Sequence, residues 1–73
     1  MIKVEFNLRL AERRERRQTL DIGEPLNLQQ LEAKLGLKHG DVGILLVNGA
    51  WAPLDSVIKD GDSVGLYPYM EGG

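Results

Sequence analysis

The sequence ends in a glycine pair, Gly72 and Gly73, which follows the aromatic segment "YPYM" at residues 67–70. Glycine usually stands where the backbone turns or where another group approaches it closely. At the last position of a sequence no turn remains to be made, so two interpretations are open. Either the glycines form an inert end, or the carboxylate of Gly73 is itself the reacting group. The end of the sequence is therefore the first candidate for chemistry.

Other residue types in the sequence offer little chemistry. None of the 73 residues is a cysteine, which rules out disulfides, thiolate metal sites, iron–sulfur clusters and thiol nucleophiles. His39 has no nucleophile or ligand partner near it and is interpreted as a surface residue, while Trp51 is expected to fill a corner of a small core. With no phosphate-binding glycine loop, metal-ligand cluster or catalytic triad in the sequence, we expect no metal and no bound cofactor.

The length of the chain limits it to one domain, residues 1–73. Because the core of so short a chain is small, an internal active-site cleft is not expected, and the protein should work inside a larger partner. Its apolar runs are far shorter than the ~20 residues of a membrane helix, and its alternating N-terminus differs from a signal peptide. Small secreted domains are often rich in disulfides, so the lack of cysteine favours a cytoplasmic protein with no membrane partner.

The net charge of −2 hides an uneven distribution of charges. Residues 1–20 carry a formal charge of +3, and residues 21–73 carry −5. The most basic segment, "ERRERR" at residues 12–17, has a composition that can contact phosphate, but no aromatic residues stand between its charges. It is interpreted as the solvated end of a hairpin, and no nucleic-acid partner is expected.

The elements that must position the terminal glycines can be predicted from hydrophobic periodicity. Apolar residues alternate with polar ones from Ile2 to Leu10, which predicts a strand with one buried face. Residues 11–16 suit a hairpin connection, and a second strand is expected around Leu20 and Ile22.

A helix is predicted over residues 27–36. Asn27 can cap it, Gln30 can complete a capping box, and Gly36 suits the left-handed conformation that often ends a helix. Its apolar face is formed by leucines at helical spacing: Leu28, Leu31 and Leu35.

Three further strands are predicted in the second half of the chain. Residues 44–47 form a continuous apolar run, as in a central strand covered on both sides, and Asn48 and Gly49 predict a tight turn. A short edge strand is expected around residues 51–54, and a last alternating strand over residues 64–68.

This order of elements predicts an α+β fold. A single helix can cover only one face of a sheet, so we expect a mixed sheet of four to five strands packed on one main helix. The expected core residues come from the strands and the helix: Val4, Phe6, Leu31, Leu35, Ile44, Leu46 and Leu66.

Three segments resemble a known family: "VNG" at residues 47–49, "DGDSV" at 60–64 and "YPYMEGG" at 67–73. They are similar to the sulfur-carrier proteins with a β-grasp, ubiquitin-like fold, among them the small subunit of molybdopterin synthase and its relative in thiamine thiazole synthesis. The tail is more similar to the molybdopterin type, which it matches at Gly61, Asp62, Val64, Tyr67, Pro68, Gly72 and Gly73. It departs from that pattern at Ser63, Tyr69 and Glu71.

The resemblance implies that Gly73 carries the function. Its carboxylate would be adenylated by an E1-like enzyme that uses ATP, and then converted to a thiocarboxylate with sulfur from a donor protein. The sulfur would pass to the large subunit of an acceptor synthase in cofactor biosynthesis, with the molybdopterin pathway favoured over the thiamine pathway. On this interpretation the protein is a co-substrate and not an enzyme, and it needs no thiol of its own.

The resemblance also implies a flexible, exposed tail over residues 69–73. Gly72, without a side chain, would let the tail enter a narrow crevice in the activating enzyme. The partner would be contacted by the residues that lead to the glycines: Tyr67, Pro68, Tyr69, Met70 and Glu71. Ordinary strand packing explains the two tyrosines equally well.

Two other functions are compatible with the same residues. In a ubiquitin-like protein modifier, the activated Gly73 would end in an isopeptide bond to a lysine. In a non-covalent β-grasp interaction module, the glycine tail would be inert. The resemblance favours the carrier over both.

Overall fold

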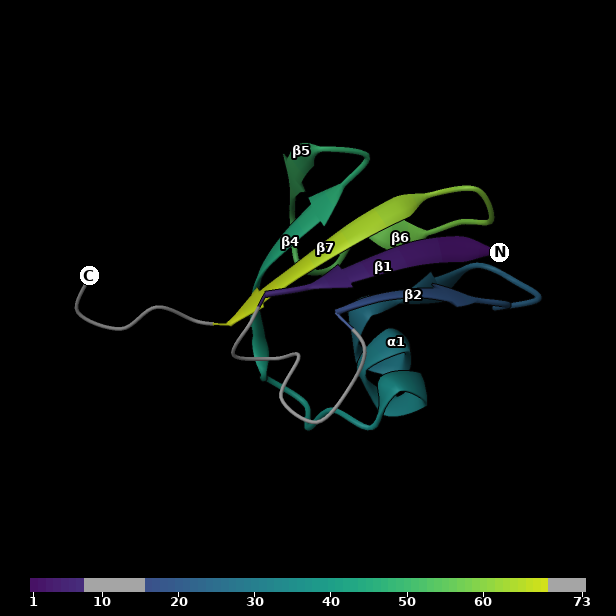
Figure 1. The fold of residues 1–73 in the computed structure, drawn as a ribbon. Helices are drawn as coiled ribbons and strands as arrows, with labels where there is room; N and C mark the ends of the chain where they lie inside the picture. Colours follow the sequence, from purple (N-terminus) through teal and green to yellow (C-terminus); the bar gives the residue numbers. More distant parts are fainter. Residues whose placement is uncertain (8–15, 69–73) are drawn as a thin grey trace.

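The computed structural model describes residues 1–7 and 16–68, which form a mixed five-stranded sheet with one helix against it (Figure 1). The strands lie in the order β2-β1-β7-β4-β5, where β1 and β7 are parallel and all other neighbours are antiparallel. Their bounds are Ile2–Phe6 for β1, Arg17–Leu20 for β2, Val42–Val47 for β4, Ala50–Ala52 for β5 and Ser63–Pro68 for β7. The predicted α+β, β-grasp architecture is confirmed, and the last strand, β7, lies at the centre of the sheet.

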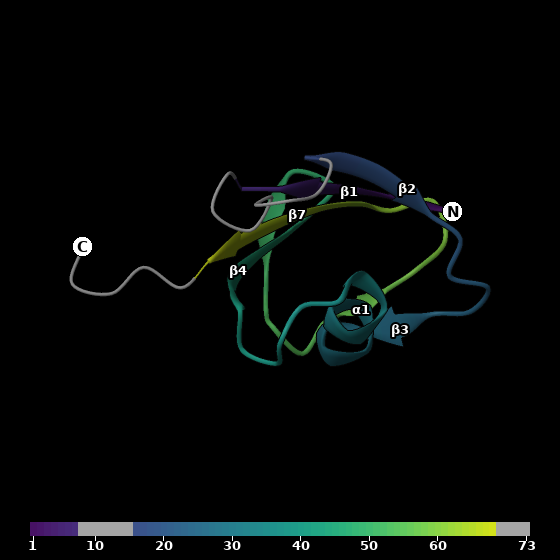
Figure 2. The same cartoon turned by 60° about the horizontal axis from the view of Figure 1, so that its bottom comes forward.

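The helix α1 (Leu28–Leu35) covers one face of the sheet, called here the inner face (Figure 2). The predicted caps are confirmed: the Asn27 side chain accepts a hydrogen bond from the Gln30 backbone N–H at 2.8 Å, and the Gln30 side chain accepts one from the Asn27 N–H at 2.9 Å. Gly36 ends the helix in the left-handed conformation, with φ of 76°. These local signals place the helix as the sequence predicts.

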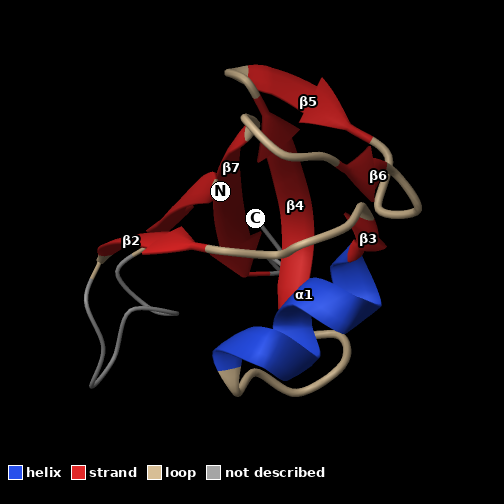
Figure 3. Ribbon diagram, turned by 90° about the vertical axis from the view of Figure 1, so that its right-hand side faces the viewer, coloured by secondary structure: helices blue, strands red, loops and turns tan. Residues whose placement is uncertain are grey.

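A second, two-stranded sheet extends this helical layer. It pairs β3 (Leu26–Asn27) with β6 (Val57–Ile58) in antiparallel register beside the start of α1 (Figure 3). Neither two-residue strand was predicted, because two residues are too few to show periodicity. Both are anchored by buried side chains, Leu26 and Ile58, which close the end of the core.

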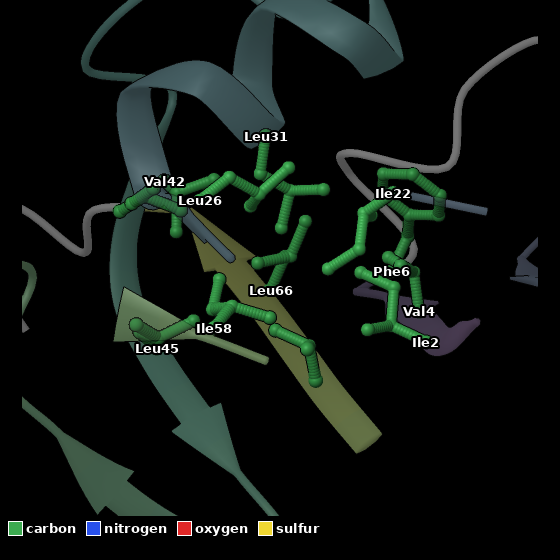
Figure 4. Packing of buried hydrophobic residues seen from close by; sticks show 12 residues of the cluster. Ile2, Val4, Phe6, Ile22, Leu26, Leu31, Val42, Leu45, Ile58 and Leu66 are labelled. Carbon is green, nitrogen blue, oxygen red and sulfur yellow. The ribbon is translucent and has the colours of Figure 1, made fainter. Parts of the chain in front are cut away.

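The core lies between the inner face of the sheet and α1 (Figure 4). Of the predicted core residues, Val4, Phe6, Leu31 and Leu66 are buried, and Leu35 is partly buried against the same cluster. Among the described residues, the buried apolar side chains are Ile2, Val4, Phe6, Ile22, Leu26, Leu28, Leu31, Val42, Leu45, Ile58, Val64 and Leu66.

The prediction for β4 is wrong in phase. Ile44 and Leu46 were expected in the core, but the structure buries Val42 and Leu45 and leaves the other two half-buried on the opposite, outer face. The cause is a bulge at Gly43, because Val42 pairs with Pro68 whereas Ile44 pairs with the adjacent Tyr67. One extra residue in a strand reverses the alternation beyond it. In the described part of the chain no helix covers the outer face, so β4 is not covered on both sides as predicted.

Trp51 is also placed differently from its prediction. Instead of filling a corner of the core, its side chain is 78% exposed on the edge strand β5. That strand ends at Ala52, before Pro53, so Leu54 lies outside it and is 48% exposed. None of the helices in the described part of the chain has both the length and the apolarity that a membrane crossing requires.

Candidate functional site

The described part of the predicted site is the end of β7, at Tyr67 and Pro68. The other predicted site residues lie outside the described residues, so their roles stay predictions: Tyr69, Met70, Glu71, Gly72 and Gly73. Because β7 is the central strand, its end is flanked by β1 on one side and by β4 on the other. Asn7, just past β1, donates a backbone hydrogen bond to the carbonyl of Leu66 at 2.9 Å, and Val42 of β4 pairs with Pro68. We call Tyr67 and Pro68 the tail root.

Tyr67 points to the outer face, as follows from the alternating strand predicted over residues 64–68 with Leu66 in the core. Its neighbour Leu66 is fully buried in the core, so alternation directs Tyr67 to the other side, where its side chain is 36% exposed. Gly65 gives it room, since a Cβ at that position would lie 3.4 Å from both Tyr67 Cε1 and Leu46 Cβ. The tyrosine and the leucine therefore lie over the glycine, and the aromatic ring is held against the sheet.

An apolar strip continues from Tyr67 across the outer face to the edge of the sheet. Its members are paired across strands: Tyr67 with Ile44, and Leu46 with Trp51. We call these four residues the outer apolar strip. The sequence prediction missed it because Ile44 and Leu46 were assigned to the core. Gly43 was the available signal, since a glycine inside a strand pattern often marks a bulge.

Charged side chains border the strip on the β1–β2 side. Leu46 and Tyr67 share an open groove of about 560 Å³ with Lys3, Glu5 and Arg17, among other residues. The Glu5 carboxylate lies 3.7 Å from Arg17 Nε and 4.0 Å from Arg16 Nη2, and all three side chains are exposed. Exposed pairs of this kind contribute little to stability. Two arginines of the "ERRERR" segment thus contact the sheet, while residues 12–15 lie outside the described residues.

The opposite end of β7 is held by a network that we call the Asn48–Asp62 clasp. Asn48 exchanges two hydrogen bonds with the backbone of Ser63 at the start of β7: its N–H donates to the Ser63 carbonyl at 2.7 Å, and its side-chain oxygen accepts from the Ser63 N–H at 2.9 Å. Its side-chain amide donates to Asp62 Oδ1 at 3.1 Å, and the Lys59 N–H donates to Asp62 Oδ2 at 2.9 Å. The clasp joins the turn after β4 to the turn before β7.

The clasp explains two of the segments that carried the family resemblance. Asn48, in "VNG", has a φ of 54°, a left-handed conformation that asparagine tolerates better than most residues. The pKa of Asp62, in "DGDSV", is lowered from its usual range, mainly by the hydrogen bond from the Lys59 backbone and then by that from the Asn48 side chain. Both hydrogen bonds favour the charged carboxylate. These residues build the frame of β7 and contribute no reacting group.

Glu32, in the middle of α1, was not singled out by the sequence. Its side chain is only 2% exposed. Glu32 Oε2 accepts a hydrogen bond from the Val42 backbone N–H at 3.2 Å, and Oε1 lies 3.4 Å from His39 Nδ1. His39 is exposed, as predicted, but it has this partner seven residues before it in the chain. An unsatisfied buried N–H costs about 1–3 kcal/mol, so Glu32 stabilises the start of β4.

Comparison with known proteins identifies relatives over nearly the whole chain. A family model described as the ThiS family matches residues 4–73. The crystal structure of SAMP1 from Haloferax volcanii has a TM-score of 0.64 and 26% identity, covering 99% of this chain and 98% of that chain. The crystal structure of a thiamine biosynthesis protein, ThiS, from Geobacter metallireducens has a TM-score of 0.58 and 25% identity. The match covers 97% of this chain and 99% of that chain. No curated protein sequence matches significantly.

Proposed function

Because this chain belongs to the ThiS family of ubiquitin-like sulfur carriers, we propose that the carboxylate of Gly73 is adenylated and then converted to a thiocarboxylate. The observation that carries this proposal is the family match, which extends through Gly73 itself. The central position of β7 supports it, because the residues that lead to Gly73 continue from the best-supported strand of the sheet. The protein then acts as a sulfur-donating co-substrate and not as an enzyme.

The proposed chemistry needs an activated carboxyl group, because a free carboxylate is a poor electrophile. A carboxylate oxygen attacks the α-phosphorus of ATP in an E1-like activating enzyme, and pyrophosphate leaves. Hydrosulfide supplied by a donor protein then attacks the acyl carbon, AMP leaves with that oxygen, and the thiocarboxylate remains with no change of oxidation state. Gly72 has no side chain to obstruct the approach of the backbone to the nucleotide.

We assign docking of the activating enzyme and of the acceptor synthase to the tail root and the outer apolar strip. Tyr67 belongs to both, and the strip extends from it to Trp51 at the edge of the sheet. Exposed aromatic side chains are enriched at the centres of protein interfaces. Tyr69, Met70 and Glu71 would extend the same contact along the tail.

Two pathways compete as the destination of the sulfur. The tail pattern favours the molybdopterin pathway, whereas the ThiS family match and the thiamine biosynthesis protein from Geobacter metallireducens favour the thiamine pathway. We give the thiamine pathway precedence, because the family match covers residues 4–73 and the tail pattern rests on a few positions. Incubation of the thiocarboxylate form with a thiazole synthase or with a molybdopterin synthase large subunit distinguishes them.

The activation itself is tested by intact mass spectrometry after incubation with the cognate activating enzyme, ATP and a sulfur donor. We expect a mass gain that matches one oxygen replaced by sulfur, located on Gly73. Matched variants that lack Gly73 or carry one extra residue after it should fold, because their core is unchanged. They should stay unmodified, because Gly73 no longer provides the terminal carboxylate. Tyr67→Ala should still be modified, with a KM raised about tenfold through weaker docking.

Two results would contradict the carrier function. Crosslinks from Gly73 to lysines of other proteins, with no thiocarboxylate, would identify a protein modifier. The absence of any modification by activating enzymes from the same cell, together with full activity of a form without Gly73, would identify an interaction module.

A further inference from the structure

The tail root has a support that lies on the helix and not in the sheet. Among the described residues, Glu32 is the one charged side chain that is buried. It lies on the face of α1 from which its carboxylate reaches the first residue of β4. A buried carboxylate is expensive to desolvate unless hydrogen bonds satisfy it, so its position needs a reason.

The register of the sheet shows why the Val42 N–H needs this carboxylate. Val42 pairs with Pro68, and proline has no N–H. The pair therefore cannot exchange two N–H···O bonds, as one kind of antiparallel pair does, and must be the other kind, in which the N–H groups point away from each other. The Val42 N–H thus points away from β7, and Glu32 accepts it at 3.2 Å.

The bulge makes this contact more important for the tail root. The regular ladder between β4 and β7 begins at Ile44 and Tyr67, beyond the extra residue Gly43. Bulges disrupt the ladder locally, so the pair Val42–Pro68 is separated from the rest of the sheet by an irregular step. The Val42 backbone N–H donates to the carboxylate of Glu32, which is itself fixed on a capped helix and contacts His39.

We propose that Glu32 is a positioning residue, which fixes the direction of the chain at Pro68 by anchoring Val42 to α1. The inference rests on the proposed function, because this direction matters for activity only if Gly73 must enter a crevice of the activating enzyme. Without the anchor, the end of β4 at Val42 is no longer fixed to the helix. The end of β7 at Pro68, which pairs with it, can then take several directions. Only a fraction of the molecules then present the tail correctly, and the apparent affinity falls by that fraction.

Three substitutions of Glu32 separate the hydrogen bond from the charge and the volume. Glu32→Leu fills the space with an apolar side chain and removes the hydrogen-bond acceptor. Glu32→Gln has a side chain of the same length and keeps an acceptor oxygen for the Val42 N–H. Glu32→Asp keeps the charge but shortens the side chain, and it serves as the test variant if the leucine variant does not fold. Asn27→Ala is the matched control, because it destabilises the same helix through its cap, whose two hydrogen bonds join Asn27 to Gln30 and do not involve β4.

The first measurement is the carrier-dependent exchange of pyrophosphate into ATP by the activating enzyme, at a temperature where every variant is folded. Glu32→Leu and Glu32→Asp should raise KM about tenfold with little change in kcat, as expected if about a tenth of the molecules present the tail correctly. Glu32→Gln should stay within about twofold of the wild type, and Asn27→Ala likewise. An unchanged KM for the folded leucine or aspartate variant, no rescue by glutamine, or an equal rise for Asn27→Ala would overturn the proposal.

The second measurement does not depend on activation. Amide hydrogen exchange followed by NMR should show that the Val42 N–H loses protection in Glu32→Leu and keeps it in Glu32→Gln. If this pattern appears while the wild-type carrier is not activated at all, the anchor stands and the proposed function fails. If Val42 keeps its protection in Glu32→Leu, the anchor itself is overturned, whatever the enzyme does.

Discussion

The two ends of the central strand β7 are held in different ways. At its start, Ser63 exchanges hydrogen bonds with Asn48, and Asp62 accepts bonds from the Asn48 side chain and the Lys59 backbone. The Asp62 carbonyl also accepts the Lys3 N–H at 3.0 Å, so β1 joins the same clasp. At its other end, Pro68 has no N–H to donate, and the facing strand has a bulge at Gly43.

This difference indicates that the two ends of β7 have different roles. The start carries many hydrogen bonds and no proposed reacting group, so it serves as a fixed point for the sheet. At the other end, Pro68 has no N–H to give to the ladder, and the pairing with β4 is irregular at Gly43. A buried carboxylate on the helix, Glu32, supports this end through its bond to the Val42 N–H. Side-chain hydrogen bonds thus hold the start of β7 directly, whereas Glu32 acts on the other end through β4.

Leu31→Ala should have the largest effect and should affect both ends equally. Leu31 is fully buried in the core that the two ends share, and such a truncation costs about 2–5 kcal/mol of unfolding free energy. Denaturant unfolding measures the total loss of unfolding free energy. Amide hydrogen exchange at Ser63 and at Tyr67 measures the loss of protection at each end of β7. A loss within experimental error would show that the apolar face of the helix is assigned wrongly.

Asn48→Ala should destabilise the start of β7 by about 2–3 kcal/mol. The change removes the two side-chain bonds of the clasp, at about 1 kcal/mol each, and places alanine at a left-handed φ, which costs about 1 kcal/mol more. Asn48→Gly is the matched control, since it loses the bonds but tolerates the conformation, and its loss should be smaller. Equal losses for both variants in urea unfolding would mean that the backbone conformation of Asn48 carries no strain.

The contrast between the two ends also separates what could be predicted from the sequence. The capping box of Asn27 and Gln30, the left-handed Gly36 and the turn at Asn48 depend on neighbouring residues, and all three predictions are confirmed. The orientation of Tyr67 followed from simple alternation along β7, and it is confirmed as well. Signals from neighbouring residues thus predicted the turn at Asn48, which lies beside the start of β7, and the face of the sheet on which each β7 side chain lies.

The tail end could not be predicted because its features depend on contacts between distant residues. Gly43 shifts the phase of β4 only through its pairing with β7, so Ile44 and Leu46 were placed on the wrong face. The bond from Glu32 to Val42 spans ten residues and has no periodic signal. Trp51, which follows the turn at Asn48, was expected to fill a corner of the core, although its place on an edge strand leaves it exposed.

Acid should weaken the clasp through Asp62. Its pKa is lower in the folded protein than its usual value of 3.8, so the unfolded chain takes up a proton first as the pH falls. The stabilisation is therefore complete above the unfolded pKa and is lost from about pH 4 downward, through the folded pKa. Solvent screens this half-exposed carboxylate, so the effect should be smaller than that of Asn48→Ala.

A pH series of urea unfolding on the wild type and Asp62→Asn checks this effect. The wild type should be the more stable protein at neutral pH, and the difference should narrow as the pH falls through the acid range. A difference that does not change with pH would mean that the charge of Asp62 contributes nothing to the clasp.

Pro68→Ala should have the smallest effect on stability. Proline at this position has no N–H bond to lose, and the main change is the greater conformational freedom of the unfolded chain, worth about 0.4–1 kcal/mol. The new N–H would point away from β4 at this kind of pair, so it should add no bond to that strand, and a bond to β1 on the other side of β7 would only reduce the loss. Denaturant unfolding beside Asn48→Ala gives the comparison directly. If Pro68→Ala lowers the free energy of unfolding as much as Asn48→Ala does, the tail end of β7 is held as firmly as its start. The proposed difference between the two ends of the strand would then be wrong.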